Sequence, residues 1–295
     1  MTELAGPATH SVREEAVELA ALSWFDLIGW RTVSGEQLAP DGPIGARSDY
    51  RQTILEPELR SALAALNGDA TPAMIDNAVR AILVAPSQDL KENNRSFHKL
   101  LSEGLSVEAP HLGEGRWEPI KVFDRDELSA NRWLVANQFV VQGDREVIRP
   151  DLVTFVNGLP LAVLELKSPV AGNATLETAF TQLQNYKNKV PELFRTNQIL
   201  VISDGIHARV GSLTAGYDRF GPWRTIDGVE DEDAGRPELE VLIRGVFAHE
   251  RFLDLICDFI AFEVEDGVVK SKELAAYHQR YPPVAAVRVG RIDER

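Results

Sequence analysis

The spacing of hydrophobic residues changes along the 295-residue chain. Up to residue 104 they recur every three or four positions, which predicts helices; from Arg116 they gather in short runs, which predict strands. The first helix is expected to begin at the capping box Ser11–Glu14 and to end at Gly29, and a Gly- and Pro-rich loop is expected at 31–55. The apolar face of this first helix is expected to hold mainly Val12, Ala16, Leu19, Ala20 and Leu27.

Three further helices are expected between residues 56 and 104, opening at Glu56, Thr71 and Ser87. On the third, Arg95, His98 and Lys99 could contact nucleic acid, but a solvated helix face is the simpler interpretation. These helices form an insertion that precedes the strands. The composition of 56–104 suggests no function for it.

The strand-rich part begins with runs at 117–124 and 133–142 and continues in a predicted hairpin, RPDLVTFVNGLPLAVLELKSP (149–169). Asn157-Gly158 between two apolar β-branched runs is a strong hairpin signal. A helix at 173–189, a strand pair at 198–213, an acidic loop at 224–237 and helix from Leu239 to Phe262 follow. The pattern predicts an α/β fold with a mixed central β-sheet flanked by helices.

Three charged residues interrupt the apolar hairpin: Asp151, Glu165 and Lys167. Glu165 and Lys167 are two residues apart on one strand and share a face, and the turn brings Asp151 back beside them. Two neighbouring carboxylates suit Mg²⁺, and a lysine beside the ion can orient an attacking water or stabilise charge at phosphorus. The alternative is an Asp at a strand start and an exposed Glu-x-Lys on an edge strand, but the apolar setting favours a metal site.

Pro150-Asp151 followed by Glu165-Leu166-Lys167 resembles the PD-(D/E)xK nuclease signature. The surrounding residues, from Asn137 to Trp223, resemble the N-terminal nuclease region of the restriction (R) subunit of type I restriction enzymes. The resemblance implies a PD-(D/E)xK endonuclease domain at 1–262 that hydrolyses double-stranded DNA with Mg²⁺. It implies metal ligation by Asp151 and Glu165 and catalytic assistance by Lys167.

The same resemblance implies supporting residues outside the hairpin. Nuclease cores of this kind begin with a helix whose glutamate joins the metal site; Glu18 is the first choice here and Glu15 the second, with a solvated glutamate as the alternative. Gln182 and Tyr186 lie four apart on one helix face and resemble the Q-x-x-x-Y element that supports the active site in one branch of these nucleases. A simple packing pair is the alternative interpretation.

Residues 263–295 are expected to be a linker and the start of a truncated or missing motor domain. Tyr277-His278-Gln279 resembles the segment whose glutamine contacts adenine, but the sequence holds no Gly-x-x-x-x-Gly-Lys-Ser/Thr loop for ATP phosphates. The resemblance therefore assigns ATP use to a full-length subunit, and target choice to partner specificity and methylation subunits.

Composition limits these expectations. The net charge is −14, and an acidic domain holds DNA poorly by itself, which favours part of a larger machine over a free-standing nuclease. A catalytically inactive scaffold that docks partner subunits is a further alternative. The single cysteine excludes an internal disulfide, no apolar run reaches membrane-spanning length, and a cytoplasmic location is expected.

Overall fold

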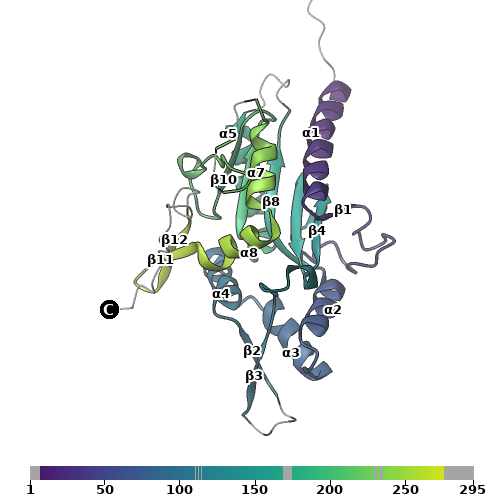
Figure 1. The fold of residues 1–295 in the computed structure, drawn as a ribbon, viewed down its shortest axis with the longest axis vertical. Coiled ribbons are helices and arrows are strands. Elements are labelled where there is room, and N and C mark those ends of the chain that lie inside the picture. Colours follow the sequence, from purple (N-terminus) through teal and green to yellow (C-terminus); the bar gives the residue numbers. More distant parts are fainter. Residues whose placement is uncertain are drawn as a thin grey trace, which may run out of the picture.

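The computed structural model describes residues 7–109, 111, 113, 115–168, 175–228, 231–232 and 235–275, with side chains from residue 15 onward. A six-stranded mixed sheet in the order β1-β4-β7-β8-β9-β10 forms its centre. Its strands are β1 (Arg31–Ser34), β4 (Trp133–Asn137), β7 (Leu152–Val156), β8 (Leu159–Leu166), β9 (Ile199–Ser203) and β10 (Ala208–Gly211). The predicted α/β fold with a mixed sheet flanked by helices is confirmed (Figure 1).

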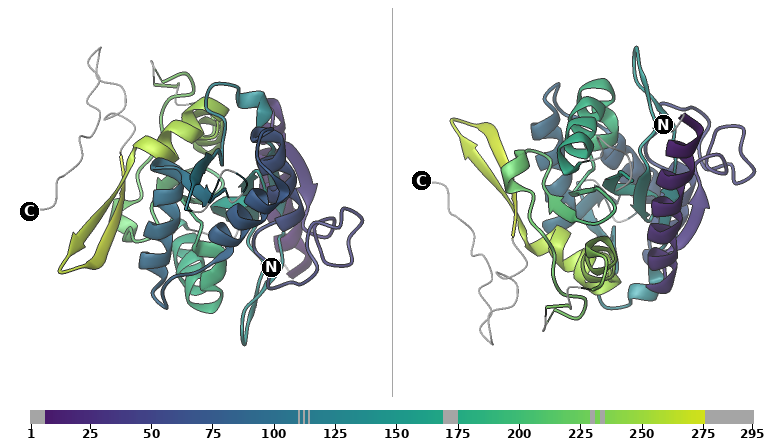
Figure 2. Two further views of the ribbon diagram at one scale, coloured as in Figure 1. Left: turned by 90° about the horizontal axis from the view of Figure 1, so that it is seen from below. Right: turned by 90° about the horizontal axis from the view of Figure 1, so that it is seen from above.

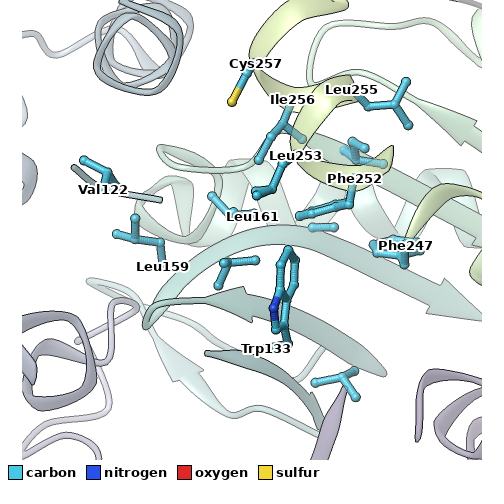
Figure 3. Packing of buried hydrophobic residues seen from close by; sticks show 14 of the residues in the cluster. Val122, Trp133, Leu159, Leu161, Phe247, Phe252, Leu253, Leu255, Ile256 and Cys257 are labelled. Atoms are coloured by element: carbon cyan, nitrogen blue, oxygen red, sulfur yellow. The ribbon is translucent and has the colours of Figure 1, made fainter. Parts of the chain in front are cut away.

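Helices cover both faces of this sheet. The first face packs against α1 (Pro7–Leu27), α7 (Glu238–Val246) and α8 (His249–Asp258). Figure 3 shows part of this core, in which Phe247 and Phe252 lie near Trp133 and Leu161. The second face packs against α5 (Leu176–Lys189) and α6 (Pro191–Phe194). Each face therefore has its own apolar core, and the sheet separates them.

The expected helical insertion is present as α2 (Glu56–Leu66), α3 (Pro72–Leu83) and α4 (Leu90–Ser102). It lies below the sheet in Figure 1 with the hairpin of β2 (Leu105–Glu108) and β3 (Trp117–Ile120). His98 on α4 is buried, because α4 packs against α8 and against the later strand Val268–Leu274 rather than facing solvent. The expectation of a solvated face was therefore wrong for His98.

The first helix differs from the expectation in its start and in its orientation. It begins at Pro7, four residues before the predicted capping box, and ends before Gly29, whose φ of +88° closes it as expected. Leu19 and Leu27 are exposed, and the face with Ala21 and Phe25 is buried instead. Sequence periodicity misassigned this face because α1 packs along a sheet edge and against α7, a contact of residues far apart in the chain.

Two segments contain strands that the sequence did not predict. Residues 31–34, expected as loop, form β1, which pairs in parallel with β4. The expected helix over 239–262 breaks after Val246 and ends at Asp258, and β11 (Ile260–Glu265) then pairs with β12 (Val268–Leu274). This hairpin projects from one side of the molecule in Figures 1 and 2, and the expected domain boundary after residue 262 falls inside it.

One buried lysine ties the β11–β12 hairpin to the core. The Lys272 ammonium donates to Asn94 Oδ1 at 2.8 Å, to the Asn197 carbonyl at 2.9 Å and to Gln198 Oε1 at 3.0 Å. All three acceptors are uncharged, and burial lowers the pKa of Lys272 well below its ordinary value. Gln198 Oε1 also lies 3.1 Å from Nδ1 of His98. One polar network therefore joins α4, the residues just before β9, and β12.

Candidate active site

The hairpin of β7 and β8 has the expected geometry. Asn157 and Gly158 at its turn adopt φ values of +52° and +80°, the left-handed conformations of a tight hairpin turn. β7 and β8 pair antiparallel, with Leu152 opposite Leu164. Asp151, just before β7, therefore lies beside the end of β8, and its Oδ2 accepts a hydrogen bond from the Leu166 N–H at 2.7 Å.

Glu165 and Lys167 meet at this end of the sheet. The Lys167 ammonium lies 2.5 Å from Glu165 Oε1, and Glu165 is only 1% exposed. β8 pairs with β7 and β9 on its two sides, so neither residue is on an edge strand. The alternative of an exposed Glu-x-Lys on an edge strand is therefore wrong for this chain.

The first helix contributes Glu18 to the same region. Glu18 is buried, whereas Glu15, the second choice, is exposed. The Gln138 side-chain amide donates to Glu18 Oε1 at 2.6 Å and to Asp151 Oδ1 at 3.5 Å, and Asn137 donates to Glu18 Oε2 at 3.4 Å. One amide thus links the helix glutamate to the hairpin aspartate.

Gln138 is the site residue that motif reasoning did not select. It follows β4 with a φ of +53°, unusual for a residue other than glycine, and its backbone N–H donates to the Asp151 carbonyl at 2.9 Å. The available signal was an Asn-Gln pair, Asn137 and Gln138, within an otherwise apolar run. The sequence shows that this polar pair is unusual, but only the tertiary structure shows that Asn137 and Gln138 contact Glu18.

Helix α5 carries Gln182 and Tyr186, and Tyr186 lies close to the carboxylates. Gln182 Nε2 donates to the Tyr186 hydroxyl at 3.0 Å, and that hydroxyl donates to the carbonyl of Arg149 at 3.3 Å. Burial, and next the charge of Glu165, raises the pKa of Tyr186 well above its ordinary value, and Asp151 adds to this effect. Tyr186 therefore lies close to the carboxylates, and Gln182 contacts its hydroxyl. The supporting role that the Q-x-x-x-Y resemblance implies stays a prediction.

The region holds three acidic side chains, Glu18, Asp151 and Glu165, and one basic side chain, Lys167. Within the described residues, no group of three or more His, Cys, Asp and Glu side chains is arranged to hold a metal ion by itself. Any ion here would depend on Asp151 and Glu165 with water and substrate oxygens, the mode typical of Mg²⁺. Gln279, expected near adenine in a full-length subunit, lies outside the described residues.

Comparison with known proteins identifies the family. Residues 11–219 match the family described as "Type I restriction enzyme R protein N terminus". The chain belongs to this family. The resemblance of the residues from Asn137 to Trp223 to the N-terminal region of the type I R subunit is thereby confirmed. The residues gathered at the end of β8 all lie within the matched range.

Individual relatives are also named as parts of type I restriction enzymes. The chain is 37% identical over 276 residues to the type I restriction enzyme HindI endonuclease subunit of Haemophilus influenzae, covering 92% of this chain and 26% of that protein. It is 30% identical over 290 residues to the MjaIXP endonuclease subunit of Methanocaldococcus jannaschii, covering 92% and 27%. The chain therefore spans about a quarter of the length of these relatives.

In the described part of the chain, no helix combines the length and apolarity that a membrane span requires.

Proposed function

We propose that this chain is the Mg²⁺-dependent endonuclease domain of a type I restriction enzyme R subunit and hydrolyses phosphodiester bonds of double-stranded DNA. The observation that carries the proposal is the meeting of Asp151, Glu165 and Lys167 at the end of β8 in a member of the R protein N-terminus family. Catalytic sites of this kind need acidic and basic groups in contact within an otherwise apolar setting. The apolar strands around them supply that setting.

The donor set fits a divalent cation. Asp151 and Glu165 offer hard carboxylate oxygens. With Glu18, three acidic side chains lie in this region beside one basic side chain, Lys167. Concentrating acidic groups at a largely buried position is unfavourable without a neutralising partner. Asp151 and Glu165 would hold the ion, which would polarise the phosphodiester and lower the pKa of a water.

The other residues orient this pair. Lys167, beside Glu165, is placed to orient the attacking water and to stabilise the negative charge that develops at phosphorus. Gln138 holds Glu18 and Asp151 in a fixed relation through one amide. Gln182 fixes the hydroxyl of Tyr186, which lies beside Glu165. These contacts limit the rotamers of the carboxylates, as an ordered catalytic site requires.

The activity of the whole subunit is part of the same proposal. Relatives named endonuclease subunits are about four times as long as the aligned region, so DNA translocation and ATP use would belong to a part outside this chain. Specificity and methylation subunits would select the target. The net charge of −14 supports this division of labour, since a free-standing nuclease needs its own cationic DNA-binding surface.

Metal titration is the experiment that tests the site. Calorimetry with Mg²⁺ and Mn²⁺ should show binding by the parent chain and at least a tenfold loss of affinity in Glu165→Gln. The matched pair Glu18→Gln and Glu15→Gln separates the buried from the exposed glutamate of α1. Only Glu18→Gln should weaken metal binding, because Glu18 alone shares the Gln138 amide with Asp151.

Three outcomes would contradict the proposal. Unchanged metal affinity in Glu165→Gln would remove Glu165 from the metal site. An assembled restriction complex that cleaves DNA at the parent rate with Lys167→Ala would remove the lysine from catalysis and favour a scaffold that docks partner subunits. Cleavage of DNA by the isolated chain alone, without other subunits, would instead support a free-standing repair or defence nuclease.

A further inference from the structure

Arg149 occupies a position that the proposed catalytic mechanism does not use. It lies between β6 (Val147–Ile148) and Asp151, and its carbonyl accepts the hydrogen bond from the Tyr186 hydroxyl at 3.3 Å. The following Pro150 is buried and restricts Arg149 to extended backbone conformations. The backbone of Arg149 is therefore fixed by one of the residues that surround the carboxylates.

The side chain of Arg149 is exposed, and in the described part of the chain it has no carboxylate within ion-pair distance. Several other arginines of this acidic chain bind groups within the fold. Arg47 donates to several carbonyls, and Arg209 pairs with Glu238. With 45 acidic and 31 basic side chains in the sequence, an exposed guanidinium without an acidic partner beside a carboxylate cluster requires an explanation.

Binding of a DNA phosphate would explain why the Arg149 guanidinium is exposed and has no acidic partner. Asp151 and Glu165 repel the phosphates that must come near them, and Lys167 is already in contact with Glu165. Arg149 lies within two residues of Asp151, a backbone reach of about 7 Å. A guanidinium can bind a phosphate through two parallel hydrogen bonds, so it fixes direction as well as supplying charge.

We propose that Arg149 binds a non-scissile phosphate of the DNA strand that enters the site and thereby positions the scissile phosphate over Asp151 and Glu165. The inference rests on the proposed nuclease function and deepens it. Arg149 is a positioning residue rather than a catalytic one. Because phosphate contacts carry no direct sequence information, this contact serves DNA of any sequence that partner subunits deliver.

The neighbouring Arg145 provides a matched control. It lies between β5 (Val141–Gln142) and β6, is exposed, and also has no carboxylate at ion-pair distance among the described residues. Its backbone has no hydrogen bond to Tyr186. Arg145→Ala therefore removes the same charge from a position four residues earlier in the chain, without removing the arginine that lies two residues from Asp151.

The test measures binding of a short DNA duplex to the chain as a function of salt, with Ca²⁺ in place of Mg²⁺ to prevent cleavage. Arg149→Ala should weaken binding about tenfold at low salt and reduce the slope of log affinity against log salt by about one. Arg149→Lys should restore the slope but only part of the affinity, because it keeps the charge and loses the two-pronged geometry. Metal affinity of Arg149→Ala, measured by calorimetry, should stay at the parent value.

The proposal is wrong if Arg149→Ala keeps the parent slope, or if Arg145→Ala lowers affinity and slope equally. It is also wrong if the parent chain binds no duplex at low ionic strength. Failure of the nuclease proposal is distinguishable, since it would be seen as unchanged metal binding by Glu165→Gln, whereas the Arg149 measurement involves no cleavage. In an assembled complex, Arg149→Ala should raise KM for DNA more than it lowers kcat.

Discussion

Replacing His98 by asparagine should reduce the acid sensitivity of this fold. His98 is 6% exposed, and its Nδ1 lies 3.1 Å from Gln198 Oε1. Burial, and next the charge of Lys272, lowers the pKa of His98 from 6.5 to about 4, although the Gln198 contact opposes this shift. The folded protein therefore holds His98 neutral over a pH range in which the unfolded chain protonates it.

The sign and size of the effect follow from linkage. Because the folded pKa lies below the unfolded one, the unfolded state binds more protons as pH falls below about 6.5, and stability decreases. With values of 6.5 and about 4, the loss from this group is about 2 kcal/mol between pH 7.5 and 5, and about 3 kcal/mol by pH 4. This is a large share of the 5–15 kcal/mol typical of a folded domain.

Urea unfolding followed by tryptophan fluorescence can measure this loss, since the chain holds five tryptophans. The free energy of unfolding would be determined for the parent and His98→Asn between pH 7.5 and 5. The variant should begin less stable, because it loses packing against Phe262, but should fall by about 2 kcal/mol less over this range. His111→Asn, an exposed position, controls for removal of an imidazole. Parallel pH profiles of the parent and His98→Asn would refute the reasoning.

The remaining predictions concern the hairpin turn, the buried lysine and the α5 tyrosine. Gly158→Ala should lower the free energy of unfolding by at least about 3 kcal/mol, measured by thermal unfolding. The φ of Gly158 is +80°, and an added Cβ would lie 2.6 Å from the carbonyl oxygen of Leu55. Gly267→Ala is the control, because Gly267 has a similar φ of +76° but open space around it, and it should cost only about 1 kcal/mol. Lys272→Met should leave three buried acceptors without their donor and lower the free energy of unfolding by about 3 kcal/mol or more. The amides of β11 and β12 should also lose protection from hydrogen exchange. Lys270→Met, at an exposed position of β12, is the control and should change stability little. Tyr186→Phe should lower DNA cleavage by an assembled complex about tenfold while the chain stays folded by circular dichroism; an unchanged cleavage rate would count against a role for its hydroxyl.

Local sequence determined the elements whose signals are contained within a few residues. The Asn157-Gly158 turn between two apolar runs fixed the hairpin, and its register places Asp151 beside Glu165 by geometry alone. The mixed sheet flanked by helices could be predicted for the same reason, since β-branched runs and helical periodicities alternate after residue 116. The family could also be recognised, because its motif and its surroundings lie in this stretch.

Only the tertiary structure decided features that depend on partners distant in the chain. β1 is four residues long and is a strand because β4 pairs with it. Lys272 connects the β11–β12 hairpin to Asn94 of α4 and to Gln198, just before β9. The buried face of α1 follows from its packing on the sheet edge and α7, which is why Leu19 is exposed and Glu18 is buried. Periodicity reports that a helix has an apolar face, but contacts between residues far apart determine which side chains meet, and so they decide the environment of Glu18, Gln138 and Arg149.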